Sequence, residues 1–100
     1  MAQQQNPFIL RDVKTGEKHP VLPEGLRVGR ASQSDITLNY EDVSRDHAAL
    51  WIQEGQLYIR DEGSTNGTFV NEERIVAARA LQPGDQVRIG DTIFEVAMET

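Results

Sequence analysis

The sequence has no cysteine, and this absence excludes disulfide bonds, thiolate nucleophiles and thiolate metal sites. It also has no run of about 18 apolar residues, the length that a membrane-spanning helix needs. The first residues, MAQQQNPFIL, lack the basic segment and the apolar segment of a secretion signal. We therefore expect a cytoplasmic protein that makes no contact with a membrane.

Positive charge is also scarce. The chain has 10 Lys and Arg against 16 Asp and Glu, so its formal net charge is −6. Proteins that bind nucleic acid or acidic lipid over a broad surface carry a basic face. The composition predicts that this chain binds neither, and that any anion site is confined to a few residues.

Helical periodicity is nearly absent, and short runs of alternating apolar and polar residues recur instead. Gly, Pro, Asn and Asp interrupt these runs at intervals of roughly 8–12 residues, which is typical of an all-β sandwich or barrel. The 100 residues fit one domain. We predict a flexible tail over 1–6 and a domain over 7–98. The predicted strands are 8–12, 18–22, 26–29, 36–38, 48–53, 56–61, 69–70, 87–89 and 92–98.

Two turns and the strand faces follow from the same pattern. Glu54-Gly55 and Gly90-Asp91 suit two-residue hairpin turns. Trp51 lies opposite its neighbours, so it is either a partly exposed aromatic or part of a second apolar layer, and the pattern leaves both open. Arg60, Arg88 and Glu95 are predicted to face outward. The predicted core residues are Leu50, Ile52, Leu57, Ile59, Val87, Ile89, Ile93 and Phe94 or Val96.

Three polar clusters could bind a ligand. In RVGRA (27–31) a Gly-Arg pair at a strand end projects a guanidinium beyond the sheet, and in SRDHA (44–48) the serine can donate to a phosphate oxygen. In DEGSTNGTFVN (61–71) the Asn66-Gly67 pair favours a type I′ hairpin turn. The short polar groups and loop amides of that stretch can also form a small anion-binding hollow. The stretch alone leaves both interpretations open.

Together, the three clusters resemble a known family. Gly29-Arg30, then Ser44-x-x-His47, then Asp61-x-x-Ser64-Thr65-Asn66-Gly67-Thr68 is similar in order and spacing to the motif set of forkhead-associated (FHA) domains. The resemblance extends from about residue 8 to about residue 96. It implies an all-β sandwich of about eleven strands in two sheets, with loops at one end that bind phosphothreonine in extended peptides.

The resemblance also implies a role for each motif residue. The phosphate-binding residues would be Arg30, Ser44 and Thr65, with Arg45 at a position that varies more in the family. Asn66 would hold the peptide main chain, and Gly29, His47 and Gly67 would support the site. Carboxylates on the segment 39–43 and at Asp35 would lie where the family reads the third residue after phosphothreonine. We therefore predict that an acidic residue is disfavoured at that peptide position.

Other functions fit the residues less well. Ser44 and His47 with Asp46 or Asp61 contain the residue types of a hydrolytic triad, but no nucleophile elbow accompanies them. The calcium-loop spacing over 61–72 has Asn66 where a glycine is required. We expect no catalytic residue, no metal and no cofactor. The preferred function is a monomeric signalling adaptor that binds a threonine-phosphorylated protein.

The competing function is a phospho-independent interaction module that uses a face or an edge of a sheet, with Trp51 as its anchor.

Overall fold

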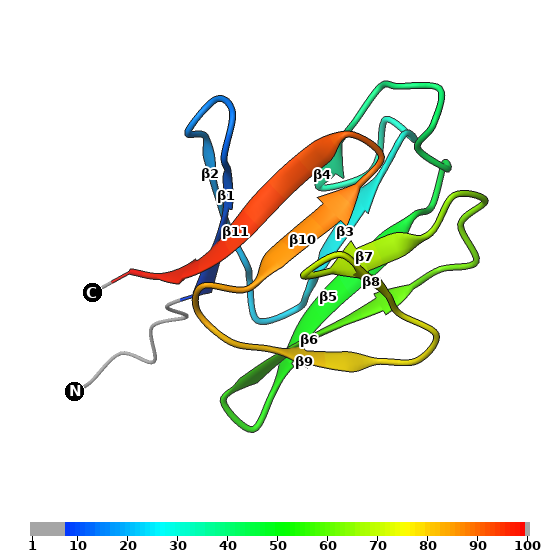
Figure 1. Ribbon diagram of the computed structural model, residues 1–100. Helices are drawn as coiled ribbons and strands as arrows, with labels where there is room; N and C mark the ends of the chain where they lie inside the picture. Colours follow the sequence, from blue (N-terminus) through cyan, green and yellow to red (C-terminus); the bar gives the residue numbers. More distant parts are fainter. Residues whose placement is uncertain (1–7, 100) are drawn as a thin grey trace.

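The computed structural model describes residues 8–99 as two β-sheets that pack face to face (Figure 1). The predicted 1–6 tail lies outside the described residues. Within them there is no helix, and so none that could cross a membrane. The strands are β1 (Phe8–Asp12), β2 (Lys18–Pro20), β3 (Leu26–Gly29), β4 (Ile36–Thr37), β5 (Ala48–Gln53), β6 (Gln56–Asp61), β7 (Thr68–Val70), β8 (Glu73–Arg74), β9 (Arg79–Leu81), β10 (Gln86–Ile89) and β11 (Thr92–Met98).

The predicted two-sheet sandwich is confirmed. One sheet has the strand order β2-β1-β11-β10-β7-β8, and the other has the order β4-β3-β5-β6-β9. β1, β3, β5, β6 and β11 have the predicted bounds, and the other predicted strands differ by one or two residues. β8 and β9 were not predicted from the alternation, because both residues of β8 are exposed and β9 buries only Leu81.

The core lies between the two sheets. The predicted inward residues of β5, β6 and β10 are fully buried, and Ile52 is partly buried against them. Phe94 and Val96 of β11 both face inward, which places the intervening positions on the other face of the strand. The prediction that Ile93 belongs to the core is therefore wrong, since Ile93 lies on the outer face and is only half-buried.

The turns show which local signals specified structure. Glu54 and Gly55 have φ values of 52° and 78°, as a type I′ hairpin requires, and Gly90-Asp91 joins β10 to β11 with Gly90 at φ 61°. The hairpin interpretation of Asn66-Gly67 is wrong, because β6 and β7 belong to different sheets and the segment between them crosses the sandwich. The hairpin of β7 lies at its other end, where Asn71-Glu72 leads into β8.

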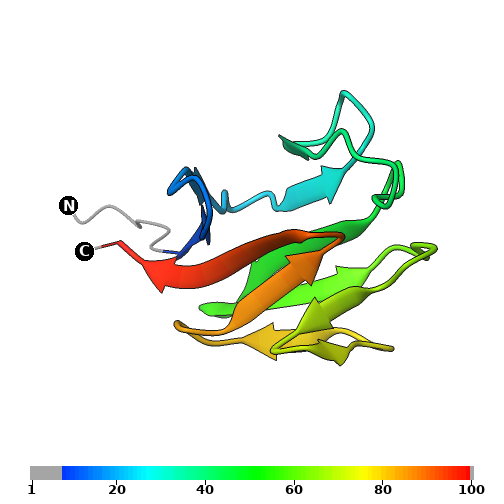
Figure 2. The same ribbon diagram turned by 45° about the horizontal axis from the view of Figure 1, so that its top comes forward.

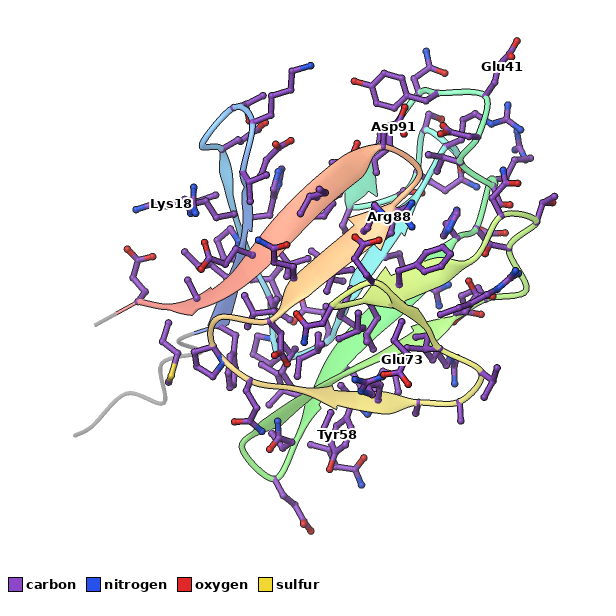
Figure 3. All side chains as sticks on the ribbon, in the orientation of Figure 1. Lys18, Glu41, Tyr58, Glu73, Arg88 and Asp91 are labelled. Atoms are coloured by element: carbon purple, nitrogen blue, oxygen red, sulfur yellow. The ribbon has the colours of Figure 1, made fainter. Side chains whose placement is uncertain are left out.

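Trp51 lies on the outer face of the five-stranded sheet and is half-buried. Its ring stacks on Tyr58 of β6 with centroids 5.6 Å apart, and the Arg60 guanidinium lies 5.6 Å from the Trp51 ring centroid. Figure 3 shows Tyr58 pointing away from the sandwich. Of the two options that the alternation left open, the structure has the partly exposed aromatic.

The strand directions separate the connecting segments into two groups. We call the segments 30–35, 38–47 and 62–67, with the turn 90–91, the tip. We call the turns 22–25, 54–55, 71–72 and 82–85 the opposite end. Figures 1 and 2 show that the three tip segments gather on one side of the molecule. The sandwich therefore brings residues that are distant in sequence to one end.

Candidate binding site at the tip

The first contact at the tip joins the β3–β4 segment to the β4–β5 segment through their main chains. The N–H of Arg30 donates to the carbonyl of Ser44 at 2.9 Å, and the N–H of Ala31 donates to that of Arg45 at 3.2 Å. A Cβ on Gly29 would stand 2.1 Å from the Arg45 carbonyl oxygen. Only glycine allows the two segments to approach this closely, and this approach sets the direction in which Arg30 leaves the sheet.

His47 joins the β4–β5 segment to the β6–β7 segment, and its side chain is 0% exposed. The N–H of Ser44 donates to its Nδ1 at 3.0 Å, and its Nε2 lies 2.9 Å from the carbonyl oxygen of Gly67. Because Nδ1 accepts a hydrogen bond, Nε2 carries the N–H, which donates a hydrogen bond to the Gly67 carbonyl oxygen. One buried imidazole thus holds two loops at a fixed separation.

Asp61 shapes the β6–β7 segment from within. Its carboxylate accepts hydrogen bonds from the N–H groups of Gly63 and Ser64 and from the hydroxyls of Ser64 and Thr68. Burial raises the pKa of Asp61, but the hydrogen bonds from the Ser64 hydroxyl, the Thr68 hydroxyl and the two amides outweigh this effect and hold the pKa below its ordinary value. Sequence reasoning gave Asp61 and Ser64 no structural role, although aspartate is a turn residue because its side chain bonds the backbone two residues on, as Asp61 does to the Gly63 N–H.

The residues that the resemblance assigns to the ligand meet at the same end of the sandwich. The hydroxyl oxygen of Ser44 accepts a hydrogen bond from the Thr65 N–H at 3.0 Å, and the Asn66 amide donates to the Asp42 carbonyl at 3.0 Å. Arg30 Nε donates to the Val43 carbonyl at 2.9 Å. Within residues 8–99 the two terminal nitrogens of Arg30, the hydroxyl proton of Ser44 and the amide oxygen of Asn66 make no hydrogen bond and are left for a ligand.

Two other predicted residues are placed differently. The main chain of Arg45 belongs to the loop contacts above, but its exposed guanidinium makes no hydrogen bond or ion pair with residues 8–99. Asp35 was grouped with the carboxylates before Ser44, yet its side chain accepts the N–H of Arg27 at 2.7 Å. Asp35 therefore lies beside β3, apart from Asp42.

Two hollows lie near these residues. One, of about 480 Å³, borders the tip and is lined by Asp12, Tyr40, Asp42 and Asp91 among others. The other, of about 530 Å³, lies on the outer face of the five-stranded sheet beside Asp35 and Trp51. Over residues 8–99, no group of three or more His, Cys, Asp or Glu side chains could hold a metal ion.

Comparisons with known proteins identify the fold and its relatives. The family model described as the FHA domain matches residues 26–90. The transcriptional regulatory protein EmbR of Mycobacterium tuberculosis is 39% identical over 92 residues, which are 91% of this chain and 24% of EmbR. An ABC transporter ATP-binding/permease protein of the same organism is 42% identical over 89 residues, which are 86% of this chain and 10% of the transporter. The chain thus spans a quarter or less of the length of these relatives.

Solved structures show the same likeness. EmbR in complex with a low-affinity phosphopeptide superposes with a TM-score of 0.91 at 35% identity, covering 97% of this chain and 26% of EmbR. A domain from an analysis of phosphothreonine-dependent FHA domain interactions superposes with a TM-score of 0.85 at 26% identity, covering 94% of this chain and 98% of that domain. The likeness therefore includes the tip as well as the two sheets.

Proposed function

The chain belongs to the FHA domain family, and from this premise we propose that it binds phosphothreonine-containing peptides through its tip. The observation that carries the proposal is the junction of three loops at Ser44. Its carbonyl accepts the Arg30 N–H, its hydroxyl accepts the Thr65 N–H, and His47 bridges it to Gly67. This junction sets a guanidinium, two hydroxyls and an amide around one region. A site built in advance avoids the entropic cost of ordering these groups when the ligand arrives.

Arg30 and Ser44 are suited to a phosphate dianion. The bond from Arg30 Nε to the Val43 carbonyl orients the guanidinium and leaves both terminal nitrogens for a bidentate contact. Because the Ser44 oxygen already accepts the Thr65 N–H, its own proton is directed to another acceptor. Each hydrogen bond to a charged group contributes about 1.5–3 kcal/mol, so two or three of them decide binding. The hydroxyl of Thr65 and the charge of Arg45 would add to this set.

Asn66 is suited to the peptide main chain. One N–H of its amide is used by the Asp42 carbonyl, which fixes the side chain and leaves the amide oxygen and a second N–H. An amide presented in this way can accept a peptide N–H and donate to a peptide carbonyl. Such pairing requires an extended ligand. Gly29, His47 and Gly67 act here as supports and touch no ligand.

The proposed unit is the domain 7–98, acting as a signalling adaptor that recruits a threonine-phosphorylated protein in the cytoplasm. It needs no catalytic step, cofactor or metal. The mycobacterial EmbR structure contains a phosphopeptide, which supports this ligand class for a chain that matches 97% of its length to that structure.

The proposal is tested by replacing Arg30. The ligand is a pool of short peptides that share a central phosphothreonine and have degenerate flanks. Calorimetry should show that the native protein binds this pool and does not bind the same pool without the phosphate. Arg30→Ala should weaken binding by about 100-fold or more, since it removes at least two charge-assisted bonds. Arg11→Ala is the matched control, because Arg11 pairs with Glu95 in the six-stranded sheet. Equal binding of the two pools, or unchanged binding by Arg30→Ala, would refute the proposal.

A second candidate function uses the outer face of the five-stranded sheet. Trp51 is half-buried there, stacks on Tyr58 and borders the hollow of about 530 Å³. Aromatic residues in such positions often anchor protein contacts. A partner that binds Arg30→Ala as well as the native protein, and that is lost with Trp51→Ala, would establish this contact instead.

A further inference from the structure

Arg74 reaches the tip from an edge strand that the family motifs do not include. β8 runs antiparallel to β7, with Arg74 opposite Phe69, and the next residue, Ile75, donates its N–H to the Thr68 carbonyl at 3.0 Å. β7 starts where the segment 62–67 ends. The last residue of β8 therefore stands beside that segment.

The side chain of Arg74 lies directly against Gly67. A Cβ on Gly67 would stand 2.7 Å from Arg74 Nε and 3.0 Å from Arg74 Cζ, so the guanidinium covers the place that a side chain would occupy. Gly67 has a φ of +94°, which also favours glycine. Asn66 precedes Gly67 and is the proposed contact for the peptide main chain. The Arg74 guanidinium thus lies against the residue that follows the proposed peptide-binding Asn66.

The carboxylates around Arg74 are engaged by other arginines. Glu73 pairs with Arg79 at 3.2 Å and Glu72 pairs with Arg88 at 3.1 Å. Arg74 itself is exposed and has no ion pair within residues 8–99. In a chain of net charge −6 with 16 acidic residues, an arginine left unpaired beside a proposed anion site is available to a ligand.

On the opposite side of the segment 62–67 lie the negatively charged side chains of Asp42 and Asp91. The Asp42 carboxylate oxygens lie 3.0 Å from where a Cβ on Gly90 would stand, and Asp91 follows in the same turn. The strand order β11-β10-β7-β8 puts this turn and Arg74 on different sides of β7. Figure 3 shows Asp91 and Glu41 near the upper end of the tip, with Glu73, the neighbour of Arg74, well below them. A peptide that crosses the segment passes acidic residues on one side and Arg74 on the other.

We propose that Arg74 is a specificity-determining residue, which selects phosphothreonine peptides with an additional oxyanion in the flank that passes β8. The oxyanion is a glutamate or aspartate carboxylate or a second phosphate, because a guanidinium binds both in the same bidentate geometry. This inference rests on the proposed function. It adds a requirement on one peptide flank to the phosphothreonine itself.

The test is a glutamate scan of a peptide with one phosphothreonine and alanine flanks, measured by calorimetry. Glutamate at a single flanking position should raise the affinity of the native protein about fivefold, which corresponds to a partly exposed charged pair. Arg74→Ala should abolish this gain and bind the alanine-flanked parent peptide within about twofold of native. Arg74→Lys should retain part of the gain, since it keeps the charge and loses the planar fork.

Arg27→Ala is the matched control, because Arg27 is also exposed, has no ion pair within residues 8–99 and changes the net charge equally. It should keep the full gain. Phosphoserine in place of the selected glutamate distinguishes the two sources, since a larger gain that also depends on Arg74 assigns the contact to a second phosphate. A scan in which no gain depends on Arg74 would overturn the inference while leaving the proposed function intact. Failure of the native protein to bind the parent peptide would overturn both.

Discussion

The tip and the opposite end of the sandwich reverse the chain in different ways. At the opposite end short-range bonds close the turns, as where Gly25 donates to the Leu22 carbonyl and Asp85 to that of Gln82. Two of these turns are also joined by the bond from the Asn71 amide to the Asp85 carboxylate. At the tip the segments are held by each other. His47 bonds to a carbonyl 20 positions away, and Asn66 bonds to one 24 positions away.

This difference separates stability of the fold from readiness of the site. A turn such as 22–25 or 54–55 depends mainly on whether its residues tolerate the required backbone angles. A loop at the tip needs its partners in place, and in return it keeps polar groups directed outward without a ligand. Damage to the tip should therefore affect stability and binding together, whereas damage at other positions should affect stability alone.

The largest effect should come from His47. We expect His47→Ala to lower the free energy of unfolding by about 4 kcal/mol, because it leaves a cavity and deprives the Ser44 N–H and the Gly67 carbonyl of their partner. Phosphopeptide binding should be lost even at temperatures where the variant is folded. Urea unfolding and calorimetry measure the two effects.

His19 supplies the matched control for that variant. It is half-buried in β2 and its ring contacts Phe94 at 6.0 Å between centroids. His19→Ala should cost about 1 kcal/mol and keep binding, since no loop of the tip depends on it. If the two histidine variants behaved alike, the distinction between the tip and the rest of the sandwich would fail.

Two glycines sharpen the comparison further. Gly29 has no room for a side chain, whereas Gly55 at the opposite end has a φ of +78° and nothing within 4 Å of the added Cβ. We expect Gly29→Ala to cost about 3 kcal/mol through forced separation of the loops, and Gly55→Ala about 1 kcal/mol through backbone strain. Only the first should abolish phosphopeptide binding. A Gly29→Ala protein with native stability and native affinity would contradict the close approach.

Local sequence predicted the parts of this fold that local contacts determine. The bounds of β5 and β6 and the hairpin between them follow from alternation and from Glu54-Gly55. Asn66-Gly67 carried an equally strong hairpin signal, but the bonds of the segment to Asp61, Ser44 and His47 hold it in a crossing between sheets. Tertiary contacts overrode a local preference there.

The candidate site became visible in the sequence through motif spacing and family resemblance. Spacing grouped Arg30, Ser44 and Asn66, and the structure brings their loops together. The motif spacing gave no indication of Arg74, because both residues of β8 are exposed and show no alternation that reveals a strand. The position of Arg74 depends on the β7–β8 register, which only the folded chain specifies.

Asp61 provides the next smaller effect. Asp61→Asn should lower the stability by about 2 kcal/mol near neutral pH, since the amide cannot accept all four hydrogen bonds. A carboxylate with a lowered pKa stabilises the fold above its unfolded pKa of about 4 and loses this contribution as the pH falls through the folded value. The difference in the free energy of unfolding between the native protein and the variant should thus be largest above about pH 5 and should decrease below about pH 4.

Asp85→Asn is the counterpart at the opposite end. Asp85 accepts the Gln82 N–H at 2.8 Å and the Asn71 amide at 3.1 Å. We expect a loss of about 1 kcal/mol, with no effect on phosphopeptide binding. A larger loss for Asp85→Asn than for Asp61→Asn in the same unfolding series would reverse the comparison.

The affinity for the phosphopeptide should depend on pH, because the phosphate group of the ligand titrates. The second pKa of a phosphate ester is about 6, so lowering the pH from about 7 to about 5 protonates most of the dianion. Affinity should fall by up to about tenfold if Arg30 and Ser44 bind the dianion selectively. Calorimetry at several pH values measures this fall, and constant affinity across the range would exclude selectivity for the dianion.

The smallest expected effect concerns the acidic side of the tip. Asp42 and Asp91 border the hollow of about 480 Å³. A glutamate at the third residue after phosphothreonine should weaken binding about threefold relative to alanine, because like charges oppose each other in partly screened surroundings. An oriented peptide library measures this preference, and selection of aspartate at that position would contradict it.

Asp42→Asn and Asp35→Asn divide that effect between the two carboxylates that the sequence grouped together. Asp42 binds Asn66 through its main-chain carbonyl, so replacing its side chain keeps this bond. Asp35 accepts the Arg27 N–H beside β3, on the face that carries Trp51. We therefore expect Asp42→Asn to remove most of the discrimination against glutamate and Asp35→Asn to leave it unchanged. The opposite result would move the peptide flank from the β10–β11 side of the tip to the edge of the five-stranded sheet.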